Sequence, residues 1–409
     1  MASCRFCGAG LKHVFCDLGL SPVANAFLKA DQLGLEEPRY PLCAYVCDQC
    51  FLVQLEQYEK PEQMFKDYVY FSSYSDTWLD HSRRYAEQVS TAFGLTPDCL
   101  VVEIGSNDGY LLQFFKQRGV RVLGIEPAEN VARAAIDKGI PTLVKFFGAA
   151  VAATLARDGK TADLLVGNNV LAHVPDLNDF VAGMKCALKP EGVITLEFPH
   201  LLELIEHGEF DTIYHEHFSY FSFLTAEKVL ARHGFTVFDV ESLPTHGGSL
   251  RIYARHAEHA GRVAAPWVEE MRVRERAAGL VTLKAYSGFG EKARKTRRAL
   301  LDFLTGARQA GKKVAGYGAP AKGNTLLNYC GIGADLIEYT VDRNPHKQGL
   351  YLPGSRIPVF HPDRVRETRP DYLLILPWNL GDEVIGQMAC IREWGGKFVT
   401  AIPAVVVTP

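Results

Sequence analysis

The chain has little excess charge of either sign and no long hydrophobic run. Its 44 lysines and arginines nearly balance 47 aspartates and glutamates, for a formal net charge of -3, so the composition is not basic enough to attract nucleic acid. No apolar stretch approaches the roughly 20 residues of a membrane span. The first residues, Met-Ala-Ser-Cys-Arg-Phe-Cys, lack the apolar core of a signal peptide. We therefore expect a globular, cytoplasmic protein that binds neither nucleic acid nor membranes.

Cysteine is scarce beyond the first fifty residues. Four early cysteines form two Cys-x-x-Cys pairs: Cys4, Cys7, Cys47 and Cys50. Two such pairs can close a tetrahedral zinc site, and a reducing compartment favours zinc over disulfides. Redox dithiols are the alternative, while Cys16 and Cys43 are expected to be small buried hydrophobic residues. Because four sulfur ligands leave no open position, the zinc is expected to be structural.

The length of the chain, 409 residues, is too great for one ordinary core. We predict an α/β protein of three parts: an N-terminal zinc-binding lobe (1–65), a central domain (66–265) and a C-terminal domain (266–409). Both larger domains show alternating strand and helix signals, which predicts a Rossmann-like fold for each. The charged segment 269–310 is predicted to be helical and to connect them.

A glycine-flanked polar turn follows an apolar run at residues 100–104. The expected cofactor-binding residues of this run and turn are Glu103, Gly105, Asn107, Asp108 and Gly109. A strand, a tight turn and a helix start form the core of a nucleotide-type cofactor site, and the glycines allow the backbone to approach a ligand. The carboxylates suit a cationic ligand better than a pyrophosphate.

Further polar residues follow the next predicted strands. Glu126 comes directly after residues 120–125, where a carboxylate can accept both ribose hydroxyls of an adenosine group, and Asn168 and Asn169 end the apolar run that begins at 164. This ordered set resembles a class I S-adenosylmethionine (SAM) methyltransferase with a doubly wound sheet. An NAD-dependent epimerase or dehydrogenase is the alternative, but the turn lacks the Gly-x-Gly-x-x-Gly spacing.

Two other segments are candidates for substrate binding. Tyr68 and Tyr70 lie in a run of aromatic and hydroxyl side chains that fits a sugar- or cofactor-facing wall, although alternating aromatics are more often core. A second glycine turn at 316–324 carries Lys322 and Asn324 instead of acids. This turn suits an anionic ligand such as a nucleotide diphosphate, with a solvated lysine as the alternative.

The segment 213–222 concentrates groups that are able to transfer protons. Tyr214, His215, Glu216 and His217 are adjacent there. A helical turn would place Tyr214 and His217 on one face, whereas an extended segment would pair Tyr214 with Glu216. Metal binding by the two histidines and burial in the core are the alternatives. Catalysis is the interpretation that accounts for all these residue types together.

From end to end, these motifs resemble the SAM-dependent sugar C-methyltransferases that act at C-3′ of dTDP-linked 3-amino-4-keto-2,3,6-trideoxy sugars in antibiotic biosynthesis. The resemblance rests on the four cysteines, on Glu103-Ile-Gly105, on Tyr214-His-Glu216-His217 and on Gly316-Tyr-Gly318-Ala-Pro-Ala-Lys322-Gly323. It implies that His217 is the base, with Glu216 and Tyr214 beside it and Tyr68 near the sugar. N- or O-methylation of a related nucleotide sugar is the alternative. No bare apolar stripe calls for a dimer, so we expect a monomer.

Overall fold

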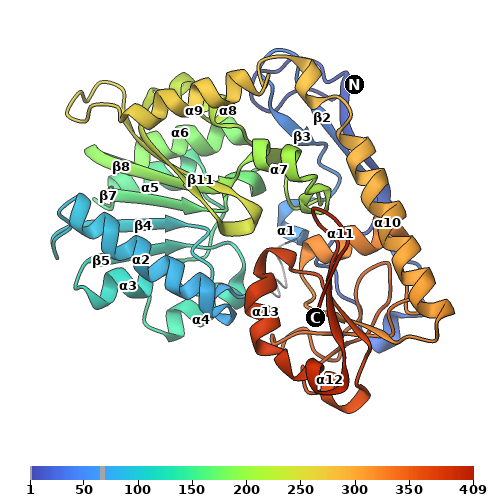
Figure 1. Ribbon diagram of the computed structural model, residues 1–409. Helices are drawn as coiled ribbons and strands as arrows, with labels where there is room; N and C mark the ends of the chain where they lie inside the picture. The colour runs from blue at the N-terminus through green and yellow to red at the C-terminus, as the bar shows by residue number, and fades with distance from the viewer. Residues whose placement is uncertain (1, 65–69) are drawn as a thin grey trace. The chain divides into compact units, whose positions relative to one another are not determined.

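The computed structural model describes residues 2–64 and 70–409 (Figure 1). Its described residues group into two compact units. The first unit comprises Met1–His13, Val46–Leu202 and Phe218–Ala285, and the second comprises Val14–Tyr45, Glu203–His217 and Tyr286–Pro409. The predicted boundaries at 65 and 265 remain predictions, because these units are discontinuous along the chain.

A seven-stranded sheet with the order β10-β11-β8-β7-β4-β5-β6 organises the first unit. The strands of this unit are β3 (Val53–Leu55), β4 (Leu100–Ile104), β5 (Arg121–Ile125), β6 (Thr142–Leu143), β7 (Ala162–Asn168), β8 (Leu188–Pro199), β9 (Ser219–Tyr220), β10 (Phe235–Leu243) and β11 (Ser249–His256). β4 pairs in parallel with β5 and β7, and β8 is parallel to β7, whereas β11 and β10 add on in antiparallel order. Parallel central strands confirm the predicted α/β class.

Helices cover both faces of this sheet; Figure 1 shows α2 and α3 on one side and α6 and α8 on the other. The helices of the first unit are α1 (Pro61–Met64), α2 (Asp76–Ala92), α3 (Leu112–Gln117), α4 (Glu129–Asp137), α5 (Ala149–Arg157), α6 (Leu177–Ala187), α8 (Phe223–Arg232) and α9 (Pro266–Ala277). The Ser75 hydroxyl caps α2 by accepting the Trp78 N–H. Buried side chains then recur every three or four residues along α2, which packs this face onto the sheet. Because all five residues of β4 are buried, its sequence is an unbroken apolar run apart from Glu103.

A six-stranded sheet with the order β14-β13-β12-β15-β16-β17 forms the core of the second unit. The strands that lie wholly or mostly in this unit are β1 (His13–Ser21), β2 (Tyr40–Val46), β12 (Val314–Tyr317), β13 (Thr340–Val341), β14 (Val359–Phe360), β15 (Tyr372–Ile375), β16 (Lys397–Thr400) and β17 (Val406–Thr408). Its pairs are parallel except β16 with β17. This sheet is the second Rossmann-like sheet expected from the sequence.

The helices of the second unit include the later part of the charged segment that the sequence predicts as a connector. They are α7 (Leu201–His207), α10 (Phe289–Gln309), α11 (Ala321–Cys330), α12 (Arg364–Thr368) and α13 (Gly381–Gln387). The segment 269–310 is two helices, α9 and α10, rather than one, and α10 buries one side, including Leu300 and Leu304. Its charged residues therefore form only the opposite, solvated face. Within the described residues, no helix is long and apolar enough to cross a membrane.

Candidate active site and metal site

Two Cys-x-x-Cys turns in the first unit bring four thiols together. The Sγ atoms of Cys4, Cys7, Cys47 and Cys50 all lie within 4.8 Å of one another. Each turn is closed the same way: the N–H of the residue after the pair, Gly8 or Phe51, donates to the carbonyl of the first cysteine at 2.9 and 3.0 Å. Both following residues have positive φ, 79° and 63°. The paired turns point four sulfurs at one place, which suits tetrahedral zinc.

A neighbouring amide supports this cluster. The Nε2 of Gln54 donates to the Cys4 Sγ at 3.1 Å, and its Oε1 accepts the N–H of Arg5 at 2.9 Å. Gln54 is 1% exposed. A donor aimed at a sulfur offsets the negative charge of a thiolate and orients it, which is the usual task of residues around a metal shell.

The predicted cofactor turn lies at the carboxyl end of β4. Gly105 has φ +68°, and its N–H donates to the Ile125 carbonyl at 2.8 Å, so the turn is attached to β5. A Cβ at position 105 would lie 3.2 Å from a methyl group of Val170. Glycine is therefore required here both by conformation and by the closeness of the next loop.

Asn107 and Glu126 hold the turn in place. The N–H of Asn107 donates to Glu126 Oε2 at 3.0 Å, and Glu126 Oε1 accepts the N–H of Ala128 at 2.9 Å. The Asn107 amide also donates to the Tyr70 carbonyl at 3.1 Å and accepts the Ser72 N–H at 2.9 Å. Burial raises the pKa of Glu126 to about 7, although these backbone donors lower it. Glu126 therefore sits at the end of β5, as expected for a ribose-binding acid, with both oxygens already used by backbone groups.

The charges of this turn differ from the sequence-based expectation of an acidic loop. Glu103 lies inside β4 and is 0% exposed, and burial raises its pKa well above the usual range, helped by the charges of Glu126 and Asp108. Asp108 is paired with Lys138 at 3.1 Å. Burial therefore disfavours the charged form of Glu103, and the Asp108 carboxylate is already paired with a lysine.

Unsatisfied polar atoms mark the neighbouring strand end. Asn168, the last residue of β7, is 6% exposed and both atoms of its amide lack a hydrogen-bond partner. Asn169 has φ +54° and donates its N–H to the Glu197 carbonyl at 2.7 Å. Buried polar groups are rarely left unpaired unless a ligand or water completes them. The orphaned amide and the Gly105 turn, on adjacent parallel strands, fit an adenosine-containing cofactor at the carboxyl edge of the sheet.

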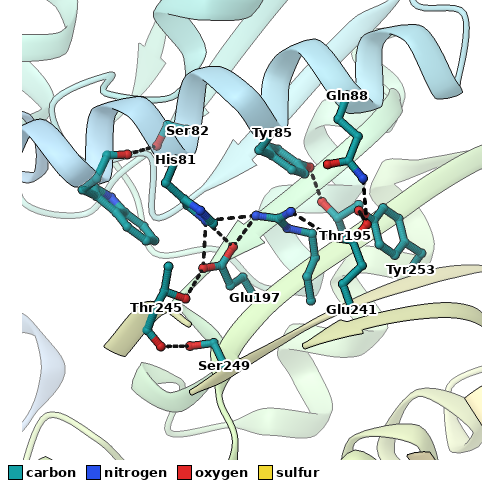
Figure 2. A network of polar contacts seen from close by, with 12 residues as sticks. His81, Ser82, Tyr85, Gln88, Thr195, Glu197, Glu241, Thr245, Ser249 and Tyr253 are labelled. Carbon is teal, nitrogen blue, oxygen red and sulfur yellow. Dashed lines mark hydrogen bonds and ion pairs between the residues drawn. The ribbon is translucent and has the colours of Figure 1, made fainter. Parts of the chain in front are cut away.

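A buried polar network attaches α2 to the sheet (Figure 2). Figure 2 shows His81, Tyr85 and Gln88 of α2 pointing toward β8, β10 and β11. Its centre is Glu197 of β8, whose oxygens lie 2.6 Å from Arg251 Nη2 and 2.9 Å from His81 Nε2. Glu197 is 0% exposed, and His81 and Arg251 lower its pKa to about 2 against the effect of burial. A permanent anion thus sits at the end of β8, next to Asn168 in register.

Tyr214 and His217 meet in the second unit. A turn closed by the His217 N–H on the Tyr214 carbonyl at 2.8 Å brings the Tyr214 hydroxyl 2.7 Å from His217 Nε2. His217 Nδ1 lies 2.9 Å from the Thr212 carbonyl oxygen. Because a carbonyl only accepts, Nδ1 must carry the proton, and Nε2 of the neutral ring is the acceptor. Of the two geometries left open by the sequence, the structure has the one that pairs Tyr214 with His217.

The other two members of the string point elsewhere. Glu216 Oε1 accepts from both the backbone N–H and the side-chain amide of Asn25, each at 3.1 Å, and burial raises its pKa. His215 Nε2 lies 3.2 Å from the Pro41 carbonyl. Among the described residues, only the four cysteines gather three or more potential metal ligands. Glu216 thus anchors the turn, and a convergence of imidazole, carboxylate and phenol on one point is not seen.

The second glycine turn places Lys322 and Asn324 on α11. Lys322 Nζ donates to Asn379 Oδ1 at 2.8 Å and lies 4.4 Å from the centre of the Trp378 ring. Burial lowers its pKa, whereas the charges of Asp211 and Glu209 raise it. Asn324 is 1% exposed and donates to the Ala24 carbonyl at 2.7 Å. Gly318 has φ +86°, and a Cβ there would lie 2.5 Å from Pro377. Glycine is therefore needed here because the turn packs closely against Pro377.

The two tyrosines predicted to contact the substrate, Tyr68 and Tyr70, have different outcomes. Tyr68 lies outside the described residues. Tyr70 is 42% exposed, and its carbonyl contacts the cofactor turn through Asn107.

Several contacts of this site were not predicted from the sequence. The residues missed are Asn25, Gln54, Asp211, Thr212 and Trp378. Asn25, Gln54, Asp211 and Trp378 contact partners that are distant in the sequence, so no local motif indicates them. Thr212 is only five residues from His217, and this proximity is the one signal in the sequence that could have indicated it.

Three family models match this chain. They are described as "Putative zinc binding domain" (residues 4–65), "Methyltransferase domain" (78–240) and "C-methyltransferase C-terminal domain" (244–403).

Known proteins resemble this chain to different extents. C-methyltransferase NovU of Streptomyces niveus is 37% identical over 400 residues, which cover 98% of this chain and 95% of that protein. Ubiquinone biosynthesis O-methyltransferase of Bartonella tribocorum is 28% identical over 95 residues, 23% of this chain and 38% of that protein. Among solved structures, magnesium protoporphyrin IX methyltransferase (ChlM) from Synechocystis PCC 6803 with bound SAM is 18% identical, with a TM-score of 0.33 over 44% of this chain and 81% of that one.

The family models and the match to NovU, together with the cysteine cluster, confirm the predicted enzyme class and cofactors. The chain is a C-methyltransferase with SAM as methyl donor, and its N-terminal cysteines form a zinc site. The alternatives of N- or O-methylation and of NAD-dependent chemistry are disfavoured by the match over nearly the whole length to a C-methyltransferase.

Proposed function

Because the chain belongs to the family of C-methyltransferases, we propose that it methylates C-3′ of a dTDP-linked 3-amino-4-keto-2,3,6-trideoxy sugar with SAM in the biosynthesis of antibiotic deoxysugars. The observation that carries the proposal is the pairing of Tyr214 with a His217 ring whose Nδ1 is held by a carbonyl. This arrangement supplies a neutral base, which the formation of a carbon nucleophile requires.

The chemistry begins with a weakly acidic proton. A carbon next to a ketone loses its proton only as the charge passes onto the ketone oxygen, forming an enolate. Since that proton is far less acidic than an imidazolium, the base must be positioned and the enolate stabilised. A positioned base contributes about 10²–10⁴-fold to the rate.

His217 is the proposed base. With Nδ1–H donated to the Thr212 carbonyl, Nε2 has a single lone pair, which accepts the Tyr214 O–H in the free protein. This lone pair takes the proton from C-3′ once the Tyr214 O–H rotates away from it. The imidazolium that forms has two N–H groups, and the Thr212 carbonyl and the Tyr214 hydroxyl oxygen are both in place to accept them. Tyr214 therefore stabilises the charged ring, and Glu216 keeps the turn in position through Asn25.

Other residues bind the reactants. When bound, SAM supplies an electrophilic methyl group, and we assign its binding to the Gly105–Gly109 turn with Glu103, Asn107 and Asp108, to Glu126, and to Asn168 with Asn169. For the nucleotide diphosphate we assign Lys322 and Asn324 at the start of α11, where backbone N–H groups favour anions. Tyr68 and Tyr70 are assigned to the sugar.

The decisive experiment replaces His217 by alanine. We expect SAM binding, measured by calorimetry, to stay unchanged while turnover of the dTDP-keto sugar falls by about 10²–10⁴-fold. Exchange of the C-3′ proton for deuterium in the absence of SAM should be lost in parallel. The control is His207→Ala, which removes a 48% exposed imidazole.

Incubation of the protein with SAM and a small panel of dTDP-keto sugars identifies the reaction through its product. Mass and carbon NMR should show a new methyl group on C-3′. A methyl group on nitrogen or oxygen, or wild-type turnover in His217→Ala, would overturn the proposal.

A further inference from the structure

A short 3₁₀ helix, Phe210–Thr212, carries the carbonyl that holds His217. Thr212 Oγ1 donates to the Glu209 carbonyl at 2.7 Å, and Ile213 donates its N–H to Phe210 at 3.0 Å. These bonds make the segment one compact turn. The contacts that hold this turn in place therefore also determine the direction of the Thr212 carbonyl.

Asp211 provides that attachment. Its side chain is 0% exposed, and Oδ2 accepts the indole N–H of Trp378 at 2.7 Å, across 167 positions of sequence. Its Oδ1 has no hydrogen-bond partner. Trp378 itself begins the 3₁₀ helix Trp378–Leu380, which follows β15 after Leu376 and Pro377. The bond therefore connects the turn before His217 to the loop that follows the carboxyl end of β15.

Burial of this carboxyl is costly and calls for an explanation. A buried polar oxygen without a partner opposes folding. The Lys322 ammonium, which lies over the Trp378 ring, supplies a positive charge that lowers the pKa of Asp211 against the rise due to burial. Neither the proposed proton transfer nor the binding of SAM uses Asp211 directly.

From these contacts we infer that Asp211 and Trp378 are positioning residues that fix the tautomer of His217 by holding the turn whose Thr212 carbonyl accepts the Nδ1 proton. The inference rests on the proposed role of His217. If the turn shifts, Nδ1 loses its acceptor and the proton is free to move to Nε2. A ring with its proton on Nε2 has its lone pair on the wrong nitrogen and is inactive as a base.

The test reads the tautomer directly. In protein labelled with ¹⁵N at histidine, with His217→Gln to identify the signal among the 13 histidines, His217 should show a protonated Nδ1 and an unprotonated Nε2. Trp378→Phe keeps an aromatic ring beneath Lys322 but deletes the N–H, and Asp211→Ala deletes the acceptor. In each variant we expect a mixture of His217 tautomers. The kcat should fall roughly tenfold, because loss of one hydrogen bond to a charged group is worth on the order of 1.5 kcal/mol. The KM for the sugar should stay within about twofold of the wild-type value. Asp211→Asn retains an acceptor and should restore the Nδ1–H tautomer.

Trp267→Phe is the matched control. Trp267 also donates its indole N–H to an aspartate, Asp239, but it is 51% exposed and belongs to the first unit, so this variant should change neither tautomer nor kcat. An unchanged His217 tautomer in either folded variant, Trp378→Phe or Asp211→Ala, overturns the inference. Because the tautomer is read without turnover, that result is distinct from failure of the proposed function, which would appear as activity in His217→Ala.

Discussion

Arg251 and Glu197 form a salt bridge of 2.6 Å with both side chains almost completely buried, at 2% and 0% exposure. The pair joins β11 to β8, and His81 of α2 contacts both partners, at 2.9 Å from Glu197 and 3.0 Å from Arg251 (Figure 2). The Arg251 guanidinium also lies 4.3 Å from the centre of the Tyr85 ring. One carboxylate thus connects a helix and two strands at the edge of the sheet where the cofactor turn lies.

Glu197→Gln should therefore strongly destabilise the protein. The variant leaves the Arg251 charge buried without its counter-ion, which costs about 3–5 kcal/mol when one partner of a buried pair is removed. Urea unfolding followed by circular dichroism measures the loss. The control, Glu291→Gln, removes a carboxylate from an exposed pair with Arg294 and should leave the midpoint unchanged. Equal midpoints for the two variants would contradict this account of the network.

Removal of zinc should destabilise the part of the first unit that contains the two cysteine turns. Structural zinc in small domains contributes an apparent binding free energy of about 10–16 kcal/mol. Cys47→Ser should lose most bound zinc, measured by metal analysis, and lower the thermal midpoint, as should a strong chelator on the wild type. Cys186→Ser changes an exposed cysteine outside the cluster and should keep one zinc per chain. Full zinc content in Cys47→Ser would rule out the four-sulfur site.

SAM affinity should rise with pH up to about 7. Burial raises the pKa of Glu126 to about 7 in the free protein, so near pH 6 most molecules carry a neutral acid. Ribose hydroxyls donate best to the ionised form, so binding must release a proton below pH 7, and affinity should increase by up to about tenfold per pH unit there before levelling off.

Calorimetry at pH 6.5 in two buffers of different ionisation enthalpy measures this proton release. Glu126→Gln should bind SAM more weakly and without proton release, whereas Glu129→Gln, one turn further along the chain, should behave as wild type. Proton uptake instead of release in the wild type would refute the assignment of Glu126.

The sequence predicted those parts of the fold that leave a local signal. Apolar runs located β4 and β12, each followed by a glycine turn, and β7, which leads into two asparagines, because parallel strands buried on both faces need unbroken apolar stretches. The Cys-x-x-Cys spacing identified the zinc site for a similar reason, since each turn fixes its own pair of sulfurs.

The sequence did not reveal contacts that depend on the fold. Glu216 and Asn25 are 191 positions apart, and Asp211 and Trp378 are 167 apart, so no local pattern links them. The effect of burial on the pKa of a carboxyl group also depends on the fold, so the sequence did not reveal it for Glu103. Glu103 lies at a strand position that the sequence shows only as polar. Its burial, which raises its pKa, follows from the packing of the whole sheet.

Tyr214→Phe should separate the contribution of the phenol from that of the base. The variant keeps the ring that packs 3.9 Å from the imidazole but removes the hydroxyl that lies 2.7 Å from Nε2. Loss of an acceptor for the imidazolium is worth on the order of 1.5 kcal/mol, so kcat should fall by roughly tenfold, well short of the loss in His217→Ala. Steady-state kinetics and deuterium exchange at C-3′ measure this, with Tyr58→Phe, a 40% exposed tyrosine, as the control. A loss equal to that of His217→Ala would assign the proton to Tyr214 instead, because a phenol that only assists the imidazole leaves the base itself intact.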